Sequence, residues 1–571
     1  MLAEIEFARP RRQASHTVEL NLSVIMSAIA AATPERECLV FGERRLTWEQ
    51  FMDRARSVAA VLAEHGLSGR DRGTATGWES TQDHVALYLH NGNEYLEAMI
   101  GSYAGRCAPV NINYRYRSAE LSYVLRDSRS RAIVYHASFG PTLAEIIDDL
   151  DDLELLLCVD DGSGVAPLPG AIDYERALAD AGQPTAPPDP SPDDLYICYT
   201  GGTTGMPKGV LWRQADFLVS ALGVRQRSGE DYDSVDQIVA QAIRGSVRAL
   251  PAPPLMHGAA HWNAISAWIS GGTVIIQDRP QRFDPADIWS TIDRESATSL
   301  LIVGDAFATP LIDEWDRAAN ESTGYSGASL RHILSGGAIL SPTSKAALLE
   351  RLPQVTIVDV LGSSESGRQG VAQQRRDQAS AESSGFVASE TALLLDETRS
   401  SVLDTSDSSI GWLAQSGRVP LGYLGDRDKT EATFPVVDGQ RLAVAGDRAR
   451  YEHQRIVLLG RESVTINTGG EKVFAEEVEV ALSSHSAVFD VVVCGRPSDR
   501  WGQEIVAVIS LRPGHSVTDD ELRAHCRRGL ADFKSPRAVV RVPVVERSPS
   551  GKADYAWARE MATPAPENET T

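Results

Sequence analysis

A glycine- and threonine-rich stretch constrains this chain more than any other part of it. The stretch runs from Tyr199 to Gly209 and reads YTGGTTGMPKG. It follows a short apolar run, Leu195 to Cys198, which predicts a buried strand, and residues 210–222 are expected to form a helix. Glycine lets backbone N–H groups turn toward an anion, threonine hydroxyls add donors, and lysine adds a positive charge. The stretch therefore predicts a phosphate-binding loop, with ligand contacts expected from Thr200, Gly201, Gly202, Thr203, Thr204, Gly205 and Lys208.

This loop differs from the Walker phosphate loop, which has four residues between its first glycine and a Gly-Lys-Ser/Thr ending. A glycine-rich turn without a ligand is the alternative interpretation. The density of glycine and threonine, the lysine and the apolar run before the loop favour phosphate binding.

Size and charge narrow the function classes. A chain of 571 residues, 42% of them hydrophobic, is long enough for roughly two to four domains with ample core. The formal net charge of −23 argues against a nucleic-acid partner, because phosphate backbones bind cationic surfaces. A nucleotide, in contrast, needs only a local positive pocket. No apolar run reaches the length of a membrane span, so we expect no such span.

The six cysteines are scattered and show no CxxC spacing. Most stand within apolar runs, which is typical of reduced thiols and argues against a disulfide framework or a zinc site. We therefore expect a cytoplasmic protein. The cysteines are Cys38, Cys107, Cys158, Cys198, Cys494 and Cys526.

Strand-like and helical runs alternate over the first part of the chain. Residues 84–89 predict a strand, and residues 46–66 and 93–104 predict helices from the spacing of their apolar side chains. The alternation continues through Cys158. It indicates an α/β domain with largely parallel strands.

The phosphate loop resembles that of the adenylate-forming superfamily, which contains acyl-CoA synthetases, peptide adenylation domains and luciferases. The resemblance extends over nearly the whole chain and implies an α/β fold. Members pair a large N-terminal domain, made of parallel sheets with helices plus a β-barrel-like subdomain, with a small mobile α+β C-terminal domain. The matching boundaries in this chain are 1–461 and 462–571.

A second motif, Leu250 to Trp262, contains Pro-Leu-Met-His and resembles the superfamily stretch near the acyl carboxylate. The resemblance implies a catalytic role for His257, although this residue alone also fits an ordinary loop histidine. Peptide-adenylating members carry an aspartate here that pairs with the amino group of their substrate. Because no carboxylate occurs between Leu250 and Ser266, an α-amino acid would leave its ammonium unpaired. The motif therefore favours a plain carboxylic acid.

Two further motifs resemble the part of the superfamily site that binds ATP. Gly337 and Ala338 match a turn of small residues beneath adenine. Residues 358–367 resemble the motif written aromatic-Gly-x-Ser/Thr-Glu, whose glutamate holds magnesium between the ATP phosphates. The resemblance assigns the metal and a catalytic role to Glu365, which alone would be taken for a solvated glutamate. It assigns nucleotide contacts to Leu361, Gly362, Ser363 and Ser364.

Two residues near this glutamate depart from the superfamily pattern. Leu361 stands where an aromatic ring commonly stacks on adenine, a contact worth about 1–3 kcal/mol on nucleic-acid bases. Arg368 stands where related sequences tend to have a smaller residue. Both departures favour a weakened or redirected use of ATP.

A further motif resembles the superfamily's ribose site. Ala445 to Asp447 matches the signature Thr-Gly-Asp, and an acceptor-only carboxylate suits the two hydroxyls of a ribose. Arg461 matches the arginine that contacts the ribose and the α-phosphate. Glu462 and Ser463 fall at the hinge between the domains, where most relatives carry Asp or Lys.

The C-terminal region carries two motifs of the same superfamily. Lys552, in the sequence SPSGKADY, matches its mobile catalytic lysine, although a lysine on such a turn is usually only solvated. Residues 466–479 resemble the loop that turns toward the active site for thioester formation, where glycine lets the pantetheine arm of coenzyme A pass. The loop residues expected to contact coenzyme A are Gly469, Gly470, Glu471 and Lys472.

The resemblance implies an acyl-CoA ligase that uses ATP, releases AMP, and requires coenzyme A and Mg²⁺. The phosphate loop, the histidine motif and the thioester loop are similar to those of actinobacterial ligases for steroid or diterpenoid acids of secondary metabolism, so a bulky polycyclic acid is expected. A medium- or long-chain fatty acid is the alternative. Small residues at 304, 306 and 308 are compatible with a roomy pocket, or equally with close packing. A homodimer is compatible with the resemblance.

Two other functions stay open from the sequence. The protein could convert acyl-AMP supplied by a partner while adenylating weakly or not at all, an interpretation that Leu361, Arg368 and Glu462 favour. The intact phosphate loop and Lys552 oppose it. A carrier-loading or purely binding module is the other alternative, although only a short polar tail follows Lys552.

Overall fold

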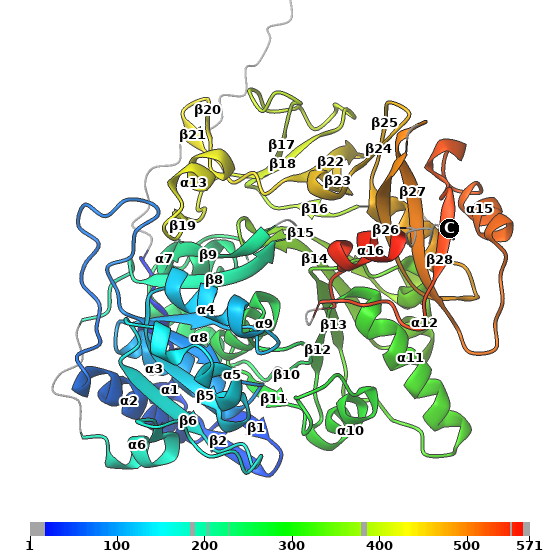
Figure 1. The fold of residues 1–571 in the computed structure, drawn as a ribbon. Coiled ribbons are helices and arrows are strands. Elements are labelled where there is room, and N and C mark those ends of the chain that lie inside the picture. The colour runs from blue at the N-terminus through cyan, green and yellow to red at the C-terminus, as the bar shows by residue number, and fades with distance from the viewer. Residues whose placement is uncertain are drawn as a thin grey trace, which may run out of the picture.

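The computed structural model describes residues 18–182, 189–202, 205–226, 228–378, 385–498, 500–548 and 551–563. Thr203 and Thr204 of the phosphate loop lie outside this part, and only the backbone is described for residues 201, 202 and 205. Figure 1 shows a large body, coloured blue through yellow, with an orange and red C-terminal part against one side of it.

The first sheet of the large domain is entirely parallel. Its strands are β3 (His84–Tyr88), β4 (Ala108–Asn111), β5 (Ser130–His136), β6 (Leu155–Val159) and β7 (Ile172–Asp173), in the order β4-β3-β5-β6-β7. Helices alternate with them, as predicted for an α/β domain. These helices are α2 (Trp48–Glu64), α3 (Asn93–Ala104), α4 (Ser118–Asp127), α5 (Gly140–Ala144) and α6 (Tyr174–Asp180). The strand expected at 84–89 and the helices expected at 46–66 and 93–104 are therefore confirmed.

A nine-stranded sheet forms the centre of the large domain, in the order β16-β15-β14-β13-β12-β10-β11-β1-β2. Its strands from β14 to β1 are parallel, and the outer strands β15, β16 and β2 run antiparallel to their neighbours. The strands are β1 (Glu37–Phe41), β2 (Arg44–Thr47), β10 (Arg248–Pro251), β11 (Thr273–Ile276), β12 (Ser299–Ile302), β13 (His332–Gly336), β14 (Thr356–Ser363), β15 (Gly367–Gln374) and β16 (Val387–Ala388). Its helices are α1 (Leu22–Ala32), α8 (Val235–Ile243), α9 (Gly258–Ile269), α10 (Pro285–Glu295), α11 (Gly304–Asn320) and α12 (Pro342–Arg351).

This sheet brings three of the predicted motifs to one edge. His257 follows β10, Gly337 follows β13, and Glu365 follows β14. Because the carboxyl ends of parallel strands lie at the same edge, side chains that follow them converge there. The topology thus explains why motifs that are far apart in sequence can share a site.

The phosphate loop connects two antiparallel strands. β8 (Leu195–Gly202) and β9 (Gly205–Arg213) form a hairpin that β19 (Gly422–Tyr423) extends, and α7 (Gln214–Ser220) follows. The helix expected over 210–222 is therefore wrong for its first four residues. Val210, Leu211 and Trp212 are fully buried in the hairpin, and pairing with β8 overrides their helical pattern.

An antiparallel subdomain follows the large sheets in the sequence and precedes the C-terminal domain, and it corresponds to the expected barrel-like subdomain. Its four strands are β17 (Ala392–Leu395), β18 (Gly411–Gln415), β22 (Asp447–Glu452) and β23 (Arg455–Arg461). The hairpin of β20 (Val436–Val437) and β21 (Gln440–Arg441) and helix α13 (Arg427–Thr433) accompany it in yellow in Figure 1.

The smaller C-terminal domain has a core of its own. Five strands, β24 (Ile466–Thr468), β25 (Glu471–Val473), β26 (Val488–Ser498), β27 (Gly502–Leu511) and β28 (Ala538–Arg541), form one sheet with α14 (Ala475–Ser483), α15 (Asp519–Cys526) and α16 (Tyr555–Ala562). A separate cluster of buried apolar side chains extends from Val464 to Ala562. This core agrees with a second domain, while the boundary at 461/462 stays a prediction.

The cysteines in the described part are all buried and free, as expected. Among the described helices, none is long and apolar enough to cross a membrane.

Candidate active site

Lys552 comes from the C-terminal domain but reaches the large domain. Its Cε lies 3.4 Å from the position that a Cβ would take on Gly337, which has a φ of +85°. The preceding Gly551 packs against Phe307 of α11, with Cε2 3.2 Å from the position of its added Cβ. Figure 1 shows the red segment before α16 crossing toward β13. The structure thus joins the two predicted site regions of the two domains.

Charged groups surround the Lys552 ammonium. Desolvation is the largest cause of its lowered pKa, although solvent still reaches the side chain. The nearby Arg461 also lowers this pKa, whereas Glu365 and Asp447 raise it. Lys552 therefore stands in a site of mixed charge where a negatively charged ligand would find two cations.

Asp447 and Arg461 face each other on neighbouring strands. They are register partners in β22 and β23, and Arg461 Nε donates to Asp447 Oδ1 at 3.0 Å. The carboxylate is the largest cause of a raised Arg461 pKa. Among the described residues no hydrogen bond to the second carboxylate oxygen of Asp447 is present, and an acceptor-only carboxylate suits a diol.

The turn that carries Glu365 is fixed against the phosphate hairpin. Trp212 Nε1 donates to the Ser364 carbonyl at 2.8 Å, and Ser364 Oγ lies 3.8 Å from Cys198 Sγ. Ser363 N–H donates to Ser366 Oγ at 3.1 Å, which closes the turn. Gly362 allows close approach, because a Cβ there would lie 2.2 Å from the Gly367 carbonyl oxygen.

Lys208 and Glu365 share one neighbour, Tyr423. The tyrosine hydroxyl donates to Glu365 Oε1 at 3.2 Å, and Lys208 Nζ lies 5.7 Å from the centre of its ring. Lys208 also forms an ion pair with Asp426, which caps α13. The sequence analysis did not identify Tyr423 and Asp426 as neighbours of the predicted site residues. Thr200 is the register partner of Lys208 in the hairpin.

His257 precedes α9 and is neutral at physiological pH. Desolvation, followed by the charge of Lys552, lowers its pKa to about 3. In the described part of the chain its buried Nε2 has no hydrogen-bond partner. An unpaired buried nitrogen is costly, so His257 is available to hydrogen-bond a ligand.

The two departures from the superfamily pattern have different surroundings. Leu361 is 6% exposed and packs with apolar side chains of the antiparallel subdomain, namely Leu394, Leu413, Ala449, Tyr451 and Ile456. Arg368 lies against Gly223, where an added Cβ would be 2.2 Å from its Nη2. Leucine at 361 therefore contributes to a core, while arginine at 368 packs over the end of α7.

The predicted thioester loop does not join this group. Gly469 and Gly470 form the turn between β24 and β25, with φ of +60° and +89°. Glu471 is exposed, and Lys472 Nζ lies 2.8 Å from Glu462 Oε1 at the hinge. In this structure Lys552 lies beside Gly337, and the turn lies beside Glu462 at the predicted hinge.

A magnesium ion would have one protein carboxylate here. Within the residues that the structure describes, no group of three or more His, Cys, Asp or Glu could hold a metal. Magnesium commonly keeps several waters and binds one or two carboxylates together with substrate phosphates. Glu365 fits that pattern, because in the described part of the chain its Oε1 accepts a hydrogen bond from Tyr423 and its Oε2 accepts none.

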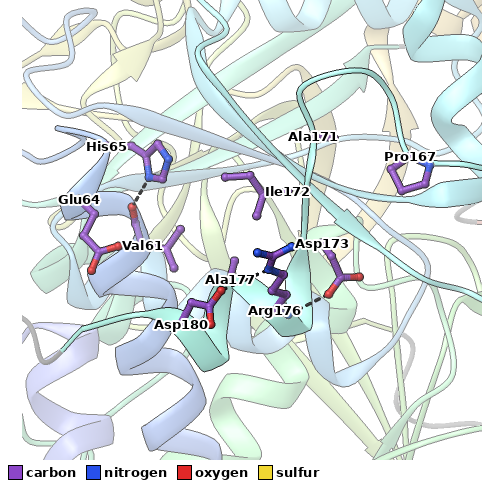
Figure 2. Close-up of a pocket in the computed structure, with 10 residues that line it drawn as sticks. All are labelled: Val61, Glu64, His65, Pro167, Ala171, Ile172, Asp173, Arg176, Ala177 and Asp180. Carbon is purple, nitrogen blue, oxygen red and sulfur yellow. Dashed lines mark hydrogen bonds and ion pairs between the residues drawn. The ribbon is translucent and has the colours of Figure 1, made fainter.

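A hollow of about 570 Å³ lies elsewhere, between the end of α2 and α6 (Figure 2). His65 Nδ1 bonds the Val61 carbonyl at 2.8 Å, and Arg176 pairs with Asp180 at 3.3 Å. None of the predicted site residues lines this hollow. It is separate from the site around Lys552.

The sequence matches two families of known proteins. Residues 26–413 match "AMP-binding enzyme", and residues 477–552 match "AMP-binding enzyme C-terminal domain". The chain belongs to the AMP-binding enzyme family.

Relatives of this AMP-binding enzyme match along nearly their whole length. The medium-chain acyl-CoA ligase Mig of Mycobacterium avium is 47% identical over 96% of this chain and 99% of its own. The 3-oxocholest-4-en-26-oate–CoA ligase of Rhodococcus rhodochrous is 36% identical over 96% and 97%. The crystal structure of the anthranilate CoA ligase AuaEII with anthranoyl-AMP has a TM-score of 0.79 at 20% identity, covering 95% and 97%, and supports the fold. The protein is an AMP-forming acid–thiol ligase.

Two half-buried carboxyl groups, those of Glu476 and Glu479, lie on α14, which follows the predicted hinge. Glu476 Oε1 accepts the Arg461 N–H at 3.2 Å, and burial raises its pKa to about 7. Glu479 accepts the Val493 N–H at 2.9 Å, and burial raises its pKa to about 8. The two groups interact, so their protons are lost as a coupled pair.

We expect Glu479→Gln to stabilise the protein at high pH. The pKa of Glu479 in the folded protein lies above the unfolded value of about 4.3, so its contribution to stability is lost as pH rises through about 8. Glutamine cannot ionise and still accepts the Val493 N–H. Thermal unfolding from pH 6 to 9 should show the variant gaining roughly 2–4 °C over the wild type at the upper end. A constant difference across that range would contradict the assignment.

Proposed function

We propose that the enzyme activates a carboxylic acid as an acyl-adenylate and then transfers the acyl group to the thiol of coenzyme A. The position of Lys552 carries this proposal, because a residue of the C-terminal domain lies beside Gly337 of the large domain. Relatives that are CoA ligases over their full length support it.

In the first step a carboxylate oxygen of the acid attacks the α-phosphorus of ATP, and pyrophosphate leaves. Lys552 is proposed to lie between the carboxylate of the acid and the α-phosphate of ATP and to lower the repulsion between these two anions. Asp447 would accept the ribose hydroxyls, and Arg461 would contact the α-phosphate. His257, neutral and unpaired at Nε2, would donate to or accept from the acid or the leaving group.

The phosphate hairpin and Glu365 would hold the rest of the nucleotide. Lys208, now paired with Asp426, is proposed to contact the phosphates through Nζ. Magnesium bound by Glu365 would neutralise charge on the phosphates. Gly337 and Ala338 would lie against adenine.

In the second step the C-terminal domain is proposed to turn about residues 461–463. Lys552 would leave the cleft, and residues 469–472 would enter it. The coenzyme A thiolate attacks the carbonyl carbon of the acyl-adenylate, the bond to AMP breaks, and acyl-CoA and AMP are the products. Two transition states with different charge distributions favour such an exchange of parts.

The substrate is proposed to be an apolar acid, with a medium-chain acid as the first candidate. The relative at 47% identity is a medium-chain ligase. Gly304 offers little support for a roomy pocket, because a Cβ there would lie 2.3 Å from the Ile339 carbonyl oxygen, and Ala308 is fully buried in a core. A steroid-type polycyclic acid is the second candidate, favoured by the relative at 36% identity.

A panel of acids tests the substrate. Octanoate, palmitate and a steroid side-chain acid would be compared by kcat/KM for acyl-CoA formation with ATP and coenzyme A. We expect octanoate to lead by about tenfold or more, since one extra or missing methylene in an apolar pocket costs about 1–3 kcal/mol. A lead by the steroid acid would reverse the order of the two candidates.

Pyrophosphate release tests whether the enzyme adenylates. With the preferred acid and ATP but no coenzyme A, we expect a burst of pyrophosphate. No release, together with acyl-CoA formation from synthetic acyl-AMP, would instead support an enzyme limited to the second step.

A further inference from the structure

Four charged side chains meet where the two domains join. Glu397 and Arg448 belong to the large domain, Glu462 lies at the hinge, and Lys472 belongs to the thioester loop; we name them the hinge cluster. Lys472 Nζ lies 2.8 Å from Glu462 Oε1 and 3.8 Å from Glu397 Oε1. Arg448 pairs with Glu397 and lies 3.7 Å from Glu462 Oε2. The cluster therefore connects both domains through two acids.

Arg448 makes the hinge cluster costly to disturb. It is 3% exposed, and its guanidinium lies 4.2 Å from the centre of the Trp412 ring. In the described part of the chain its Nε and Nη1 are buried without a hydrogen bond, as is Glu462 Oε2. A buried cation with incomplete hydrogen bonding depends on nearby carboxylates. Glu397, with its exposed side chain, pairs with this cation and approaches Lys472.

The contacts of Lys472 depend on the arrangement of the domains. Lys472 lies on β25 of the C-terminal domain, while Glu397 follows β17 of the large domain. Any turn of one domain against the other changes the distance between them. The same structure has Lys552 beside Gly337, which is the domain arrangement proposed for adenylation. Lys472 therefore approaches Glu397 in that arrangement.

We propose that Glu397 is a positioning residue that holds Lys472 and the thioester loop at the hinge during adenylation and releases them for thioester formation. This inference rests on the proposed two-step function. Glu397 touches no reacting group in this role. It acts by favouring one domain arrangement over the other, so its loss has opposite effects on the two steps.

Glu397→Gln tests the proposal through the two half-reactions measured separately. Exchange of labelled pyrophosphate into ATP with the acid, without coenzyme A, reports the first step. Formation of acyl-CoA from synthetic acyl-AMP reports the second. We expect the first rate to fall by about 2- to 5-fold and the second to stay equal or rise. Glu462→Gln removes the charge opposite both Arg448 and Lys472. It is expected to raise the ratio of the second rate to the first rate further than Glu397→Gln does.

Glu390→Gln is the matched control, because it removes an exposed carboxylate of the same subdomain outside the hinge cluster. It should leave both rates unchanged. A parallel fall of both rates in Glu397→Gln, or no change in either, would overturn the proposal. Absence of exchange in the wild type with every acid would instead count against the proposed function itself, so the two failures are distinguishable.

Discussion

Lys552→Ala is expected to slow adenylation by about 10²- to 10³-fold. The ammonium lies beside Gly337 and within electrostatic reach of Arg461, where the acid and the α-phosphate are proposed to meet. Removing it leaves two anions to approach each other with one cation fewer. The measurement is exchange of labelled pyrophosphate into ATP with the preferred acid.

The same variant should retain thioester formation. In the second step Lys552 is proposed to have left the cleft, so acyl-CoA formation from synthetic acyl-AMP should change by less than about threefold. Arg528→Ala removes an exposed cation of the same domain and serves as the control for charge alone. Equal losses in both half-reactions would contradict the assigned role, and so would full exchange activity.

The site residues were predicted from motifs that resemble those of the superfamily, and their assigned roles stay predictions; the topology explains why these motifs can lie together. His257, Gly337 and Glu365 each follow a parallel strand of one sheet, and the topology then brings them to one edge. Asp447 and Arg461 are register partners across one hairpin. The motifs single out these residues, and the fold brings the residues together.

The sequence was misleading where pairing outweighs local pattern. The apolar side chains at 210–212 suit a helix as well as a strand, and only the partner strand β8 decides between them. Leu361 presents a related case, because its burial depends on five residues between 394 and 456 that no local pattern connects to it.

Long-range ion pairs could not be predicted at all. Lys208 pairs with Asp426, and Lys472 approaches Glu397, across many intervening residues. Charged residues of both signs are frequent along the chain, so composition gives no preference for one partner. Only the packed arrangement of the subdomains selects these pairs.

A variant in the thioester loop is expected to have the opposite effect to Lys552→Ala, namely to slow the second half-reaction and spare the first. Gly470→Val is expected to reduce acyl-CoA formation from acyl-AMP by about 100-fold, because a side chain in the proposed path of the pantetheine arm would displace the thiol from its reacting position. Adenylation should be nearly unchanged. In the present arrangement a Cβ on Gly470 would have no atom within 4 Å, so the first added carbon meets open space here.

Backbone strain is the competing explanation, since the φ of Gly470 is +89° and a left-handed conformation costs other residues about 1–2 kcal/mol. Gly514→Val separates the two effects. Gly514 belongs to the same domain, has a φ of +76° and likewise has no atom within 4 Å of an added Cβ. If strain alone acts, both variants lose thermal stability, and the ratio of the two half-reaction rates stays as in the wild type. If residues 469–472 form the path of the thiol, only Gly470→Val loses the second half-reaction, and Lys552→Ala loses only the first.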